Sequence, residues 1–461
     1  MKAAFHNLGC KVNEYETEAM KQQLADEGYG IVPFDEKADV YIVNTCTVTA
    51  MADRKSRQML HKARQKNPAA VIAAAGCYVE NAGRTLLEDG TVDLIIGNNE
   101  KKRLAELLTA YHKGIVRETI PDIAGETSYD ELKLARPVDR TRAFVKIQDG
   151  CNQFCTYCRI PYVRGRVRSR RREDVLAEIR RLADSGVREI VLTGIHISSY
   201  GLDFREGLPA SAMRTPEAAH AVTNDCLLDL IREMASVDGI ARIRLGSLEP
   251  GIVTEDFAAG ISAVDKICPQ FHLSLQSGCD STLRRMNRRY TTADFRRSAA
   301  LLRRCFDRPA LTTDVIVGFP GETEAEFSET KTFLEEIRFA KTHIFKYSRR
   351  AGTKAAVMPA QVSEPVKTAR SRLLLDLDEA NSAAYARSIA DRPLTVLFEE
   401  KKIIDGRTYW KGHSRENLMV LMASEADLEN EILSCRYVSP GPEGTVIGEM
   451  APTVENKDSL E

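Results

Sequence analysis

The first 125 residues alternate short apolar runs with stretches whose apolar positions repeat every three or four residues. Four runs, at residues 3–8, 39–44, 69–75 and 92–96, have the length and composition of buried strands. The intervening stretches, such as 14–27 and 51–66, are amphipathic and predict helices. Strands that alternate with helices predict a parallel sheet with helices on its faces, which we assign to an N-terminal domain of residues 1–125.

The same alternation returns in a second region, which we assign to residues 138–375. The predicted strands are 144–148, 189–193, 243–246, 272–275, 314–317 and 343–347. Six such units predict a partial (β/α)6 barrel, because a full barrel of eight units needs more chain. Residues 81–83 and 118–138 are interpreted as connections, the latter as a linker between domains. The polar stretch 203–224 is longer than an ordinary βα loop.

After residue 385 the pattern changes to short alternating runs at 394–398, 408–411, 418–422 and 432–438. Turn sequences at 405–406 and 440–442 separate them. This pattern predicts a small all-β barrel over residues 385–450, of the kind that binds nucleic acids, with a dimerisation or structural appendage as the alternative. The predicted fold class is therefore α/β with an N-terminal parallel sheet, a central partial barrel and a C-terminal β-barrel.

Composition is that of a globular protein with more than one domain. The chain has 461 residues, of which 43% are hydrophobic and 28% charged. The N-terminal apolar run ends too early for a secretory signal, and no stretch of eighteen apolar residues occurs. Eleven cysteines without such a signal indicate a reducing compartment. We therefore expect a cytoplasmic protein without a membrane partner.

Charge is distributed unevenly, although the formal net charge is only −1. The last residues, 443–461, are acidic, whereas one short segment is rich in arginine: Arg159, Arg164, Arg166, Arg168, Arg170, Arg171 and Arg172. Such a run is usually a solvated helix face. Because the run directly follows a group of cysteines, we expect it to contact the phosphates of RNA instead.

Three cysteines within eight residues are the most informative feature of the chain. Cys151, Cys155 and Cys158 have the spacing Cys-x3-Cys-x2-Cys and follow the first predicted strand of the central barrel. Thiolates are the ligands of iron–sulfur clusters, and three of them leave one iron of a four-iron cube without a protein ligand. A structural zinc site would want a fourth ligand, and no second Cys pair follows nearby. The spacing therefore predicts a four-iron cluster with an open iron.

Three further cysteines occupy equivalent places in the N-terminal domain. Cys10, Cys46 and Cys77 each follow the end of a predicted strand by one or two residues. The carboxyl ends of parallel strands lie along one edge of a sheet, where ligands bind. A single free cysteine is often just a buried small residue, but three in equivalent positions predict the ligands of a second cluster.

Local sequences around both cysteine sets make the chain resemble the radical S-adenosylmethionine (SAM) methylthiotransferases over nearly its whole length. The matching segments are residues 8–13, 43–48, 75–77, 151–166, 192–194, 275–278, 314–322 and 347–353. The C-terminal barrel is similar to the RNA-binding TRAM domain of the family. The resemblance implies an enzyme that adds a methylthio group to a tRNA base or a ribosomal protein, using SAM and two [4Fe-4S] clusters.

The residues after Cys10 resemble one branch of the family. Gly-Cys-Lys-Val-Asn at 9–13, followed by Glu14 to Glu18, resembles the bacterial branch that acts on N6-threonylcarbamoyladenosine next to the anticodon. The isopentenyladenosine branch tends to have Gln-Met-Asn there, and the ribosomal-protein branch Pro-Lys-Asn. Lys11 is expected either to pair with the carboxylate of threonylcarbamoyladenosine or to be a solvated first residue of a helix.

The resemblance also implies cofactor contacts and partners. Positions that resemble SAM contacts of radical SAM barrels are Tyr157, Gly194, Ser247, Glu249, Gln276 and Gly318. Tyr157 has a packing role as its alternative, and each of the others is otherwise an ordinary strand-end residue. The partners implied are tRNA and an electron donor such as a flavodoxin-like protein. No residue is assigned as a catalytic acid or base.

Two other functions fit parts of the same evidence. A second two-cluster enzyme would act on isopentenyladenosine in tRNA or on a ribosomal protein. A non-enzymatic iron–sulfur protein would bind RNA and use its clusters only for folding. Release of 5′-deoxyadenosine from SAM under a strong reductant separates an enzyme from a structural protein.

Overall fold

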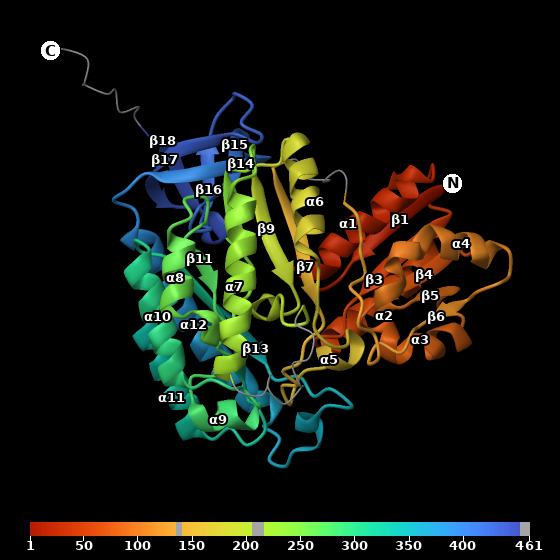
Figure 1. Ribbon diagram of the computed structural model, residues 1–461, viewed down its shortest axis with the longest axis horizontal. Helices are drawn as coiled ribbons and strands as arrows, with labels where there is room; N and C mark the ends of the chain where they lie inside the picture. The colour runs from red at the N-terminus through yellow and green to blue at the C-terminus, as the bar shows by residue number, and fades with distance from the viewer. Residues whose placement is uncertain (135–140, 205–215, 452–461) are drawn as a thin grey trace.

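The structure, a computed structural model, describes residues 1–134, 141–204 and 216–451, and its N-terminal part is built on a six-stranded parallel sheet (Figure 1). In spatial order the strands are β2 (Gly30–Val32), β1 (Lys2–Asn7), β3 (Val40–Thr45), β4 (Val71–Gly76), β5 (Leu94–Ile96) and β6 (Glu118–Thr119). The helices are α1 (Lys11–Asp26), α2 (Ala50–Lys66), α3 (Val79–Glu88), η1 (Asn98–Arg103) and α4 (Leu104–His112). Alternate residues of the strands enter two separate apolar clusters, one on each face of the sheet. The predicted parallel sheet is therefore confirmed.

Two predicted connections of this region have more structure than expected. Residues 81–83 lie inside α3, where a Cβ on Gly83 would come within 2.8 Å of Ile95 Cδ1. The glycine thus permits close packing of helix on strand, and our interpretation of residues 81–83 as a connection was wrong. The described part of the 118–138 segment contains β6 and buries Leu132 and Leu134 against the central barrel. Residues 135–138 lie outside the described residues.

The central region is an open barrel of parallel strands, as predicted. One sheet contains β10 (Arg242–Leu245), β9 (Glu189–Gly194) and β7 (Arg142–Asp149), with the short antiparallel β8 (Arg168–Ser169) at its edge. The second sheet contains β11 (Gln270–His272), β12 (Ala310–Val317) and β13 (Lys341–Lys346). Parallel bridges from Ile243 to Ile267 and from Leu248 to Leu273 join the two. Six parallel strands therefore form a partial (β/α)6 barrel.

Helices cover the outside of this barrel (Figure 1). They are α5 (Ile160–Val163), α6 (Arg172–Asp184), α7 (Pro216–Ala235), α8 (Glu255–Ser262), α9 (Asp280–Arg285), α10 (Thr292–Cys305), α11 (Glu324–Ile337) and α12 (Glu364–Ser388), with 3-10 turns η2 (Ile197–Ser199), η4 (Pro250–Ile252) and η5 (Lys354–Val357). The stretch 203–224 ends in the first residues of α7, and residues 205–215 lie outside the described residues. No helix among the described residues is long and apolar enough to cross a membrane.

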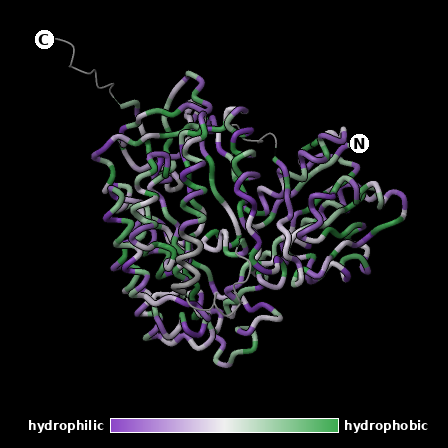
Figure 2. Tube along the Cα trace, viewed as in Figure 1, coloured by the Kyte–Doolittle hydropathy of each residue, from purple (hydrophilic) through white to green (hydrophobic). Residues whose placement is uncertain are grey.

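Alternation along the barrel strands separates an apolar outer face from a polar inner face. Val145 and Ile147 of β7, and Val315 and Val317 of β12, pack in one large core with the surrounding helices. Figure 2 shows a hydrophobic stretch along the neighbouring strand β9 in the middle of the barrel. Because successive side chains of a strand point to opposite faces, the residues between them face the inside of the barrel.

The C-terminal region is a closed barrel of five strands in the order β14-β15-β16-β18-β17. The strands are β14 (Leu394–Ile404), β15 (Arg407–Ser414), β16 (Met419–Ala423), β17 (Ile432–Pro440) and β18 (Val446–Met450), with η6 (Pro442–Gly444) before the last. Asp405 and Gly406, with φ of 49° and 76°, form the predicted two-residue hairpin turn. β18 had not been predicted because it lies in the segment we had interpreted as an acidic tail. The predicted all-β barrel is confirmed.

Candidate functional site

Cys10, Cys46 and Cys77 converge at the carboxyl edge of the N-terminal sheet. They follow β1, β3 and β4, which are neighbours in the sheet. A Cβ on Gly9 would lie 3.0 Å from Cys46 Sγ, so the loop that carries Cys10 runs directly beside Cys46. Positive φ values of 110° at Gly9 and 94° at Gly76 shape the turns before Cys10 and Cys77.

A frame of buried polar side chains holds these three cysteine loops together. Asn13 Nδ2 donates to the carbonyls of Leu8 at 2.7 Å and Thr45 at 3.0 Å. Asn44 Nδ2 donates to the Asn13 carbonyl at 2.9 Å. The first turn of α1 is therefore tied to the ends of β1 and β3, which fixes the place of Cys10 relative to Cys46.

The second set, Cys151, Cys155 and Cys158, lies on the loop that follows β7. The Cys158 N–H donates to the Cys155 carbonyl at 2.9 Å, and the Cys151 N–H donates to the Gly165 carbonyl at 3.1 Å. Gly150, with φ of 70°, starts the loop where a Cβ would overlap the Arg166 carbonyl. Arg288 Nη1 donates to Cys155 Sγ at 3.4 Å, which brings a buried cation to this set.

Cys46 of the first set and Cys158 of the second are poor acids in the surroundings that the protein alone provides. Burial raises the pKa of Cys46 to about 12, and nearby Cys77 and Cys10 add to the shift. Burial likewise raises the pKa of Cys158 to about 12, with contributions from Cys155 and from Cys77 of the other set. Thiols that interact in this way ionise together only when a metal compensates their charge. Three thiols whose charges interact, with Arg164 or Arg288 donating to one of them, fit an iron–sulfur cluster.

A buried ionic network lies between the two cysteine sets, centred on Arg164. This side chain is fully buried, and its Nε donates to Cys77 Sγ at 3.2 Å. Its two Nη atoms donate to Glu16 of α1 at 2.8 and 2.9 Å, and Nη1 also donates to Asp149 of β7. Lys146 pairs with both carboxylates, at 2.8 and 2.6 Å. The loop after the triplet is thus bonded to the cysteine edge of the N-terminal sheet.

The network keeps its carboxylates ionised. Burial alone would raise the pKa of Glu16, but the charges of Arg164, Lys101 and Lys146 outweigh it and hold that pKa well below its usual range. The pKa of Asp149 is lowered in the same way, with burial opposed by Arg164 and Lys146.

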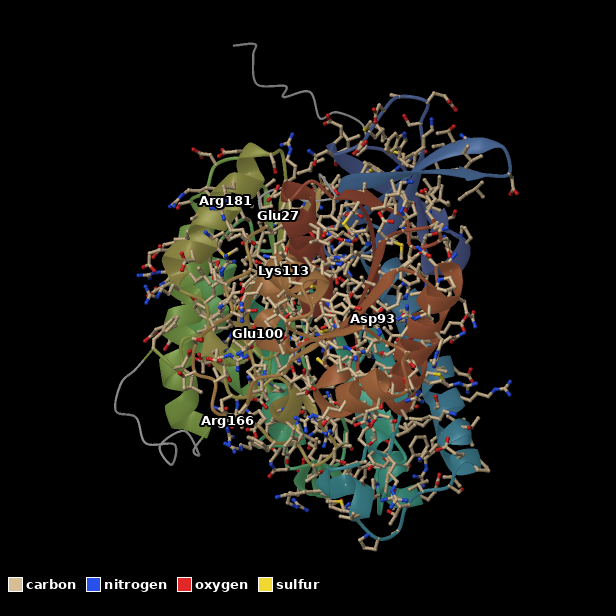
Figure 3. The ribbon with its side chains drawn as sticks, turned by 90° about the vertical axis from the view of Figure 1, so that its right-hand side faces the viewer. Glu27, Asp93, Glu100, Lys113, Arg166 and Arg181 are labelled. Atoms are coloured by element: carbon tan, nitrogen blue, oxygen red, sulfur yellow. The ribbon has the colours of Figure 1, made fainter. Side chains whose placement is uncertain are left out.

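Our interpretation of the arginine run was wrong for three of its members. Arg164, Arg168 and Arg170 are at most 1% exposed, so they face neither solvent nor RNA. Arg168 donates to the carbonyls of its own loop, and Arg170 pairs with Glu131 and Glu178. The exposed members are Arg166, Arg171 and Arg172, and Arg159 is half-buried. Figure 3 shows Arg166 at the molecular surface.

The carboxylate of Glu249 lies beside the cysteine triplet. Gln153, inside the triplet loop, donates to Glu249 Oε2 at 2.9 Å. His196 Nε2 lies 3.3 Å from the same oxygen, and Arg288 Nη2 lies 3.6 Å from Oε1. Sequence reasoning missed Gln153, His196 and Arg288. The position of Gln153 between two cysteines of the triplet could have indicated it, whereas no sequence motif points to His196 or Arg288.

The remaining predicted SAM contacts lie at strand ends, in different surroundings. Gly194 ends β9 close to the Gln148 carbonyl, Ser247 follows β10 and is exposed, and Gln276 has φ of 68°. Tyr157 packs edge-on against Phe319 with centroids 6.4 Å apart, which is the packing role weighed as its alternative. A Cβ on Gly318 would lie 2.3 Å from Lys367 Cγ, so a helix side chain occupies the space beside this glycine.

Lys11 points toward the central barrel. Its Nζ lies 5.9 Å from the ring centroid of Phe144, an inner-face residue of β7. Partial burial lowers the pKa of Lys11, and the nearby Arg142 and Arg244 lower it further. Within the described part of the chain Lys11 forms no ion pair.

Comparisons with known proteins agree with this geometry. The model of the family described as uncharacterized protein family UPF0004 matches residues 2–97, and the radical SAM superfamily model matches residues 145–334. The chain is 37% identical to threonylcarbamoyladenosine tRNA methylthiotransferase MtaB of Bacillus subtilis, over 95% of this chain and 94% of that protein. It is 34% identical to tRNA-2-methylthio-N(6)-dimethylallyladenosine synthase of Moorella thermoacetica, over 93% of this chain and 94% of that protein. A solved radical SAM methyltransferase, TsrM of Kitasatospora setae, shares the fold with a TM-score of 0.55 and 18% identity, over 77% of each chain.

Proposed function

The chain belongs to the radical SAM methylthiotransferase family, and we propose that it adds a methylthio group to C2 of N6-threonylcarbamoyladenosine beside the anticodon of tRNA. The observation that carries this proposal is the meeting of two three-cysteine sets across one interface, linked by Arg164. Each set suits a [4Fe-4S] cluster with one iron left for another ligand. SAM and iron–sulfur clusters are the cofactors of this chemistry.

The protein's own residues prepare the site in separate ways. When bound, the triplet cluster supplies the electron that cleaves SAM, and the resulting radical activates a C–H bond that acid–base chemistry cannot. Arg288 and Gln153 hold the Glu249 carboxylate next to the triplet loop, and we propose that it also contacts the amino group of SAM. Arg164 holds the edge of the N-terminal sheet at a fixed place beside the same loop.

Lys11 supports the choice of threonylcarbamoyladenosine over isopentenyladenosine. Its amine faces the barrel without an acidic partner among the described residues, in the company of Arg142 and Arg244. Arg142 and Arg244 already lie 4.0 and 3.0 Å from carboxylate oxygens of Glu189, so a ligand carboxylate would serve as the partner of Lys11 itself. Threonylcarbamoyladenosine carries a carboxylate, whereas the isopentenyl group is apolar. The relatives that carry the threonylcarbamoyl name include three at 35–37% identity.

The division of labour follows the three regions. We propose that residues 1–125 hold the second cluster, residues 138–375 the triplet cluster and SAM, and residues 385–450 contact tRNA. A flavodoxin-like protein is the proposed electron donor, and the cytoplasm the proposed location. The six cysteines are the proposed cluster ligands, and Gly194, Ser247, Glu249 and Gln276 the proposed SAM contacts.

Nucleoside mass spectrometry of tRNA from a deletion strain tests the proposal. We expect the methylthio group to disappear from threonylcarbamoyladenosine and to persist on isopentenyladenosine. Complementation with Lys11→Met should restore little of it, whereas Lys113→Met, at an exposed lysine directly after α4 (Figure 3), should restore it fully. Loss from isopentenyladenosine, or from a ribosomal protein instead, would contradict the substrate assignment.

A further inference from the structure

Three side chains with metal-binding chemistry converge inside the central barrel, apart from both cysteine sets. His272 ends β11, Asp314 lies in β12 and His343 lies in β13, three neighbouring strands. One ligand atom from each lies within 4.8 Å of the others. The strand register sets Asp314 opposite His343, and it sets His272 opposite Thr312, two residues before Asp314.

The pattern of the strands directs these side chains to the inner face. Val315 and Val317 pack in the outer core, so Asp314 projects to the opposite side of β12. Its partner in the ladder, His343, shares that face. Leu273 lies in the outer core as well, which turns His272 inward. The three groups therefore face the barrel interior rather than the covering helices.

Hydrogen bonding leaves one imidazole nitrogen of His272 without a partner. Nδ1 of His272 lies 3.1 Å from Thr312 Oγ1, and Thr312 Oγ1 also accepts a hydrogen bond from Gln270 Nε2 at 3.4 Å. Nε2 is buried and makes no hydrogen bond. In the tautomer in which Nδ1–H donates to Thr312, the Nε2 lone pair points at the group. Metal-binding histidines have this arrangement, with the second nitrogen held by an outer hydrogen bond.

One of the three distances in this group suits two ligands of a common ion better than a hydrogen bond, and all three ligand atoms lie within 4.8 Å of one another. His272 Nε2 and Asp314 Oδ2 are 3.4 Å apart, which is longer than the usual 2.7–3.2 Å of an N–H···O bond. Ligands about 2.0–2.2 Å from a metal, at a tetrahedral angle, are roughly 3.3–3.5 Å from each other.

We propose that His272, Asp314 and His343 bind a divalent transition-metal ion inside the barrel, separate from the two iron–sulfur clusters. Two imidazoles and one carboxylate suit Zn²⁺, Fe²⁺ or Mn²⁺ and leave coordination positions open. With neutral imidazoles the ligands carry one negative charge, so the bound ion keeps a net positive charge toward the barrel interior. An oxygen donor such as water or a carboxylate would complete the shell.

Titration of the reconstituted holoenzyme with Mn²⁺, followed by electron paramagnetic resonance, tests this site. Mn²⁺ prefers oxygen and nitrogen donors, so it reports this group and avoids the thiols. With both clusters in their oxidised, silent state, we expect one Mn²⁺ per chain, with nitrogen couplings from imidazole. Asp314→Asn and His272→Ala should each abolish this binding, and Thr312→Val should weaken it by about 10- to 100-fold through loss of the outer hydrogen bond.

His61→Ala is the matched control, because His61 is an exposed histidine of α2 outside the group. It should bind Mn²⁺ like the wild type. Each variant is first checked for unchanged iron content and an unchanged midpoint of thermal unfolding. If a ligand variant fails that check, the Mn²⁺ affinity of Thr312→Val provides the test instead. Absence of bound Mn²⁺ in the wild type, a signal without nitrogen coupling, or equal binding by Thr312→Val and wild type would overturn the proposal.

Discussion

Replacing Arg164 by Met should destabilise the protein far more than replacing an arginine two residues away. The side chain is fully buried and donates to Asn13, Glu16, Asp149 and Cys77. Removing one partner of a buried ion pair costs about 3–5 kcal/mol. Because Lys146 still pairs with both carboxylates, we expect the lower end, about 3 kcal/mol.

Urea unfolding of the iron-free protein, followed by circular dichroism, measures this loss without a contribution from the clusters. With a slope of about 2–3 kcal/mol per molar, a loss of about 3 kcal/mol lowers the midpoint by roughly 1–1.5 M. We compare midpoints because several domains unfold. Arg166→Met is the control, since Arg166 is exposed and its guanidinium lies 4.4 Å from the Phe154 ring centroid, a contact worth about 0.5–1 kcal/mol.

A double-mutant cycle then tests whether the effect belongs to the network. Glu16→Gln should cost less in the Arg164→Met background than in the wild type, because its strongest partner is already gone. A midpoint shift for Arg164→Met no larger than that for Arg166→Met would refute the reasoning. So would strictly additive effects of the Arg164 and Glu16 substitutions.

Three further predictions concern the clusters, pH and RNA. Replacing the triplet cysteines Cys151, Cys155 and Cys158 by alanine should remove about half of the bound iron and abolish 5′-deoxyadenosine release. Replacing Cys10, Cys46 and Cys77 by alanine should also remove about half of the iron but leave that release intact. Burial raises the pKa of Asp130 to about 6, so the folded state favours the protonated carboxyl and the free energy of unfolding falls as pH rises from 4 to 6. Asp130→Asn should therefore raise the free energy of unfolding by up to about 3 kcal/mol at pH 7.5 and by little at pH 4. Equal urea midpoint shifts at both pH values would contradict this. Lys401→Glu and Arg407→Glu, at exposed positions of the C-terminal barrel, should weaken tRNA binding and reduce its salt dependence without changing SAM cleavage, and unchanged affinity would assign that barrel a structural role.

Periodicity was enough to predict the sheets and the meeting of the cysteines. Strands β1, β3 and β4 each contain a short apolar run, and a cysteine follows each strand at the carboxyl edge that parallel strands share. Elements whose formation depends on tertiary neighbours were not predicted. Gly83 lies in a helix because Ile95 packs against it, and β18 forms only because β16 and β17 flank it. The local sequence does not indicate which distant residues will pack against an element.

The buried arginines also could not be predicted from the local sequence, because their ion-pair partners are tertiary neighbours. These ion pairs help to hold the two cysteine sets in fixed relative positions. Glu16 of α1, which pairs with Arg164, and Glu131, which pairs with Arg170, are far away in the sequence, so the run resembled a solvated face. Hydrophobic contacts tolerate sliding, whereas a guanidinium bonded to two carboxylates and a thiol in one fixed fork does not. Arg164 follows Cys158 by six residues and donates to Cys77 Sγ, so it links the two sets together with the bonds from Asn98 to the Val163 carbonyl and from Arg168 to Asn99. Only the exposed members of the run, Arg166, Arg171 and Arg172, can reach a partner at the surface, and we propose that these three contact tRNA.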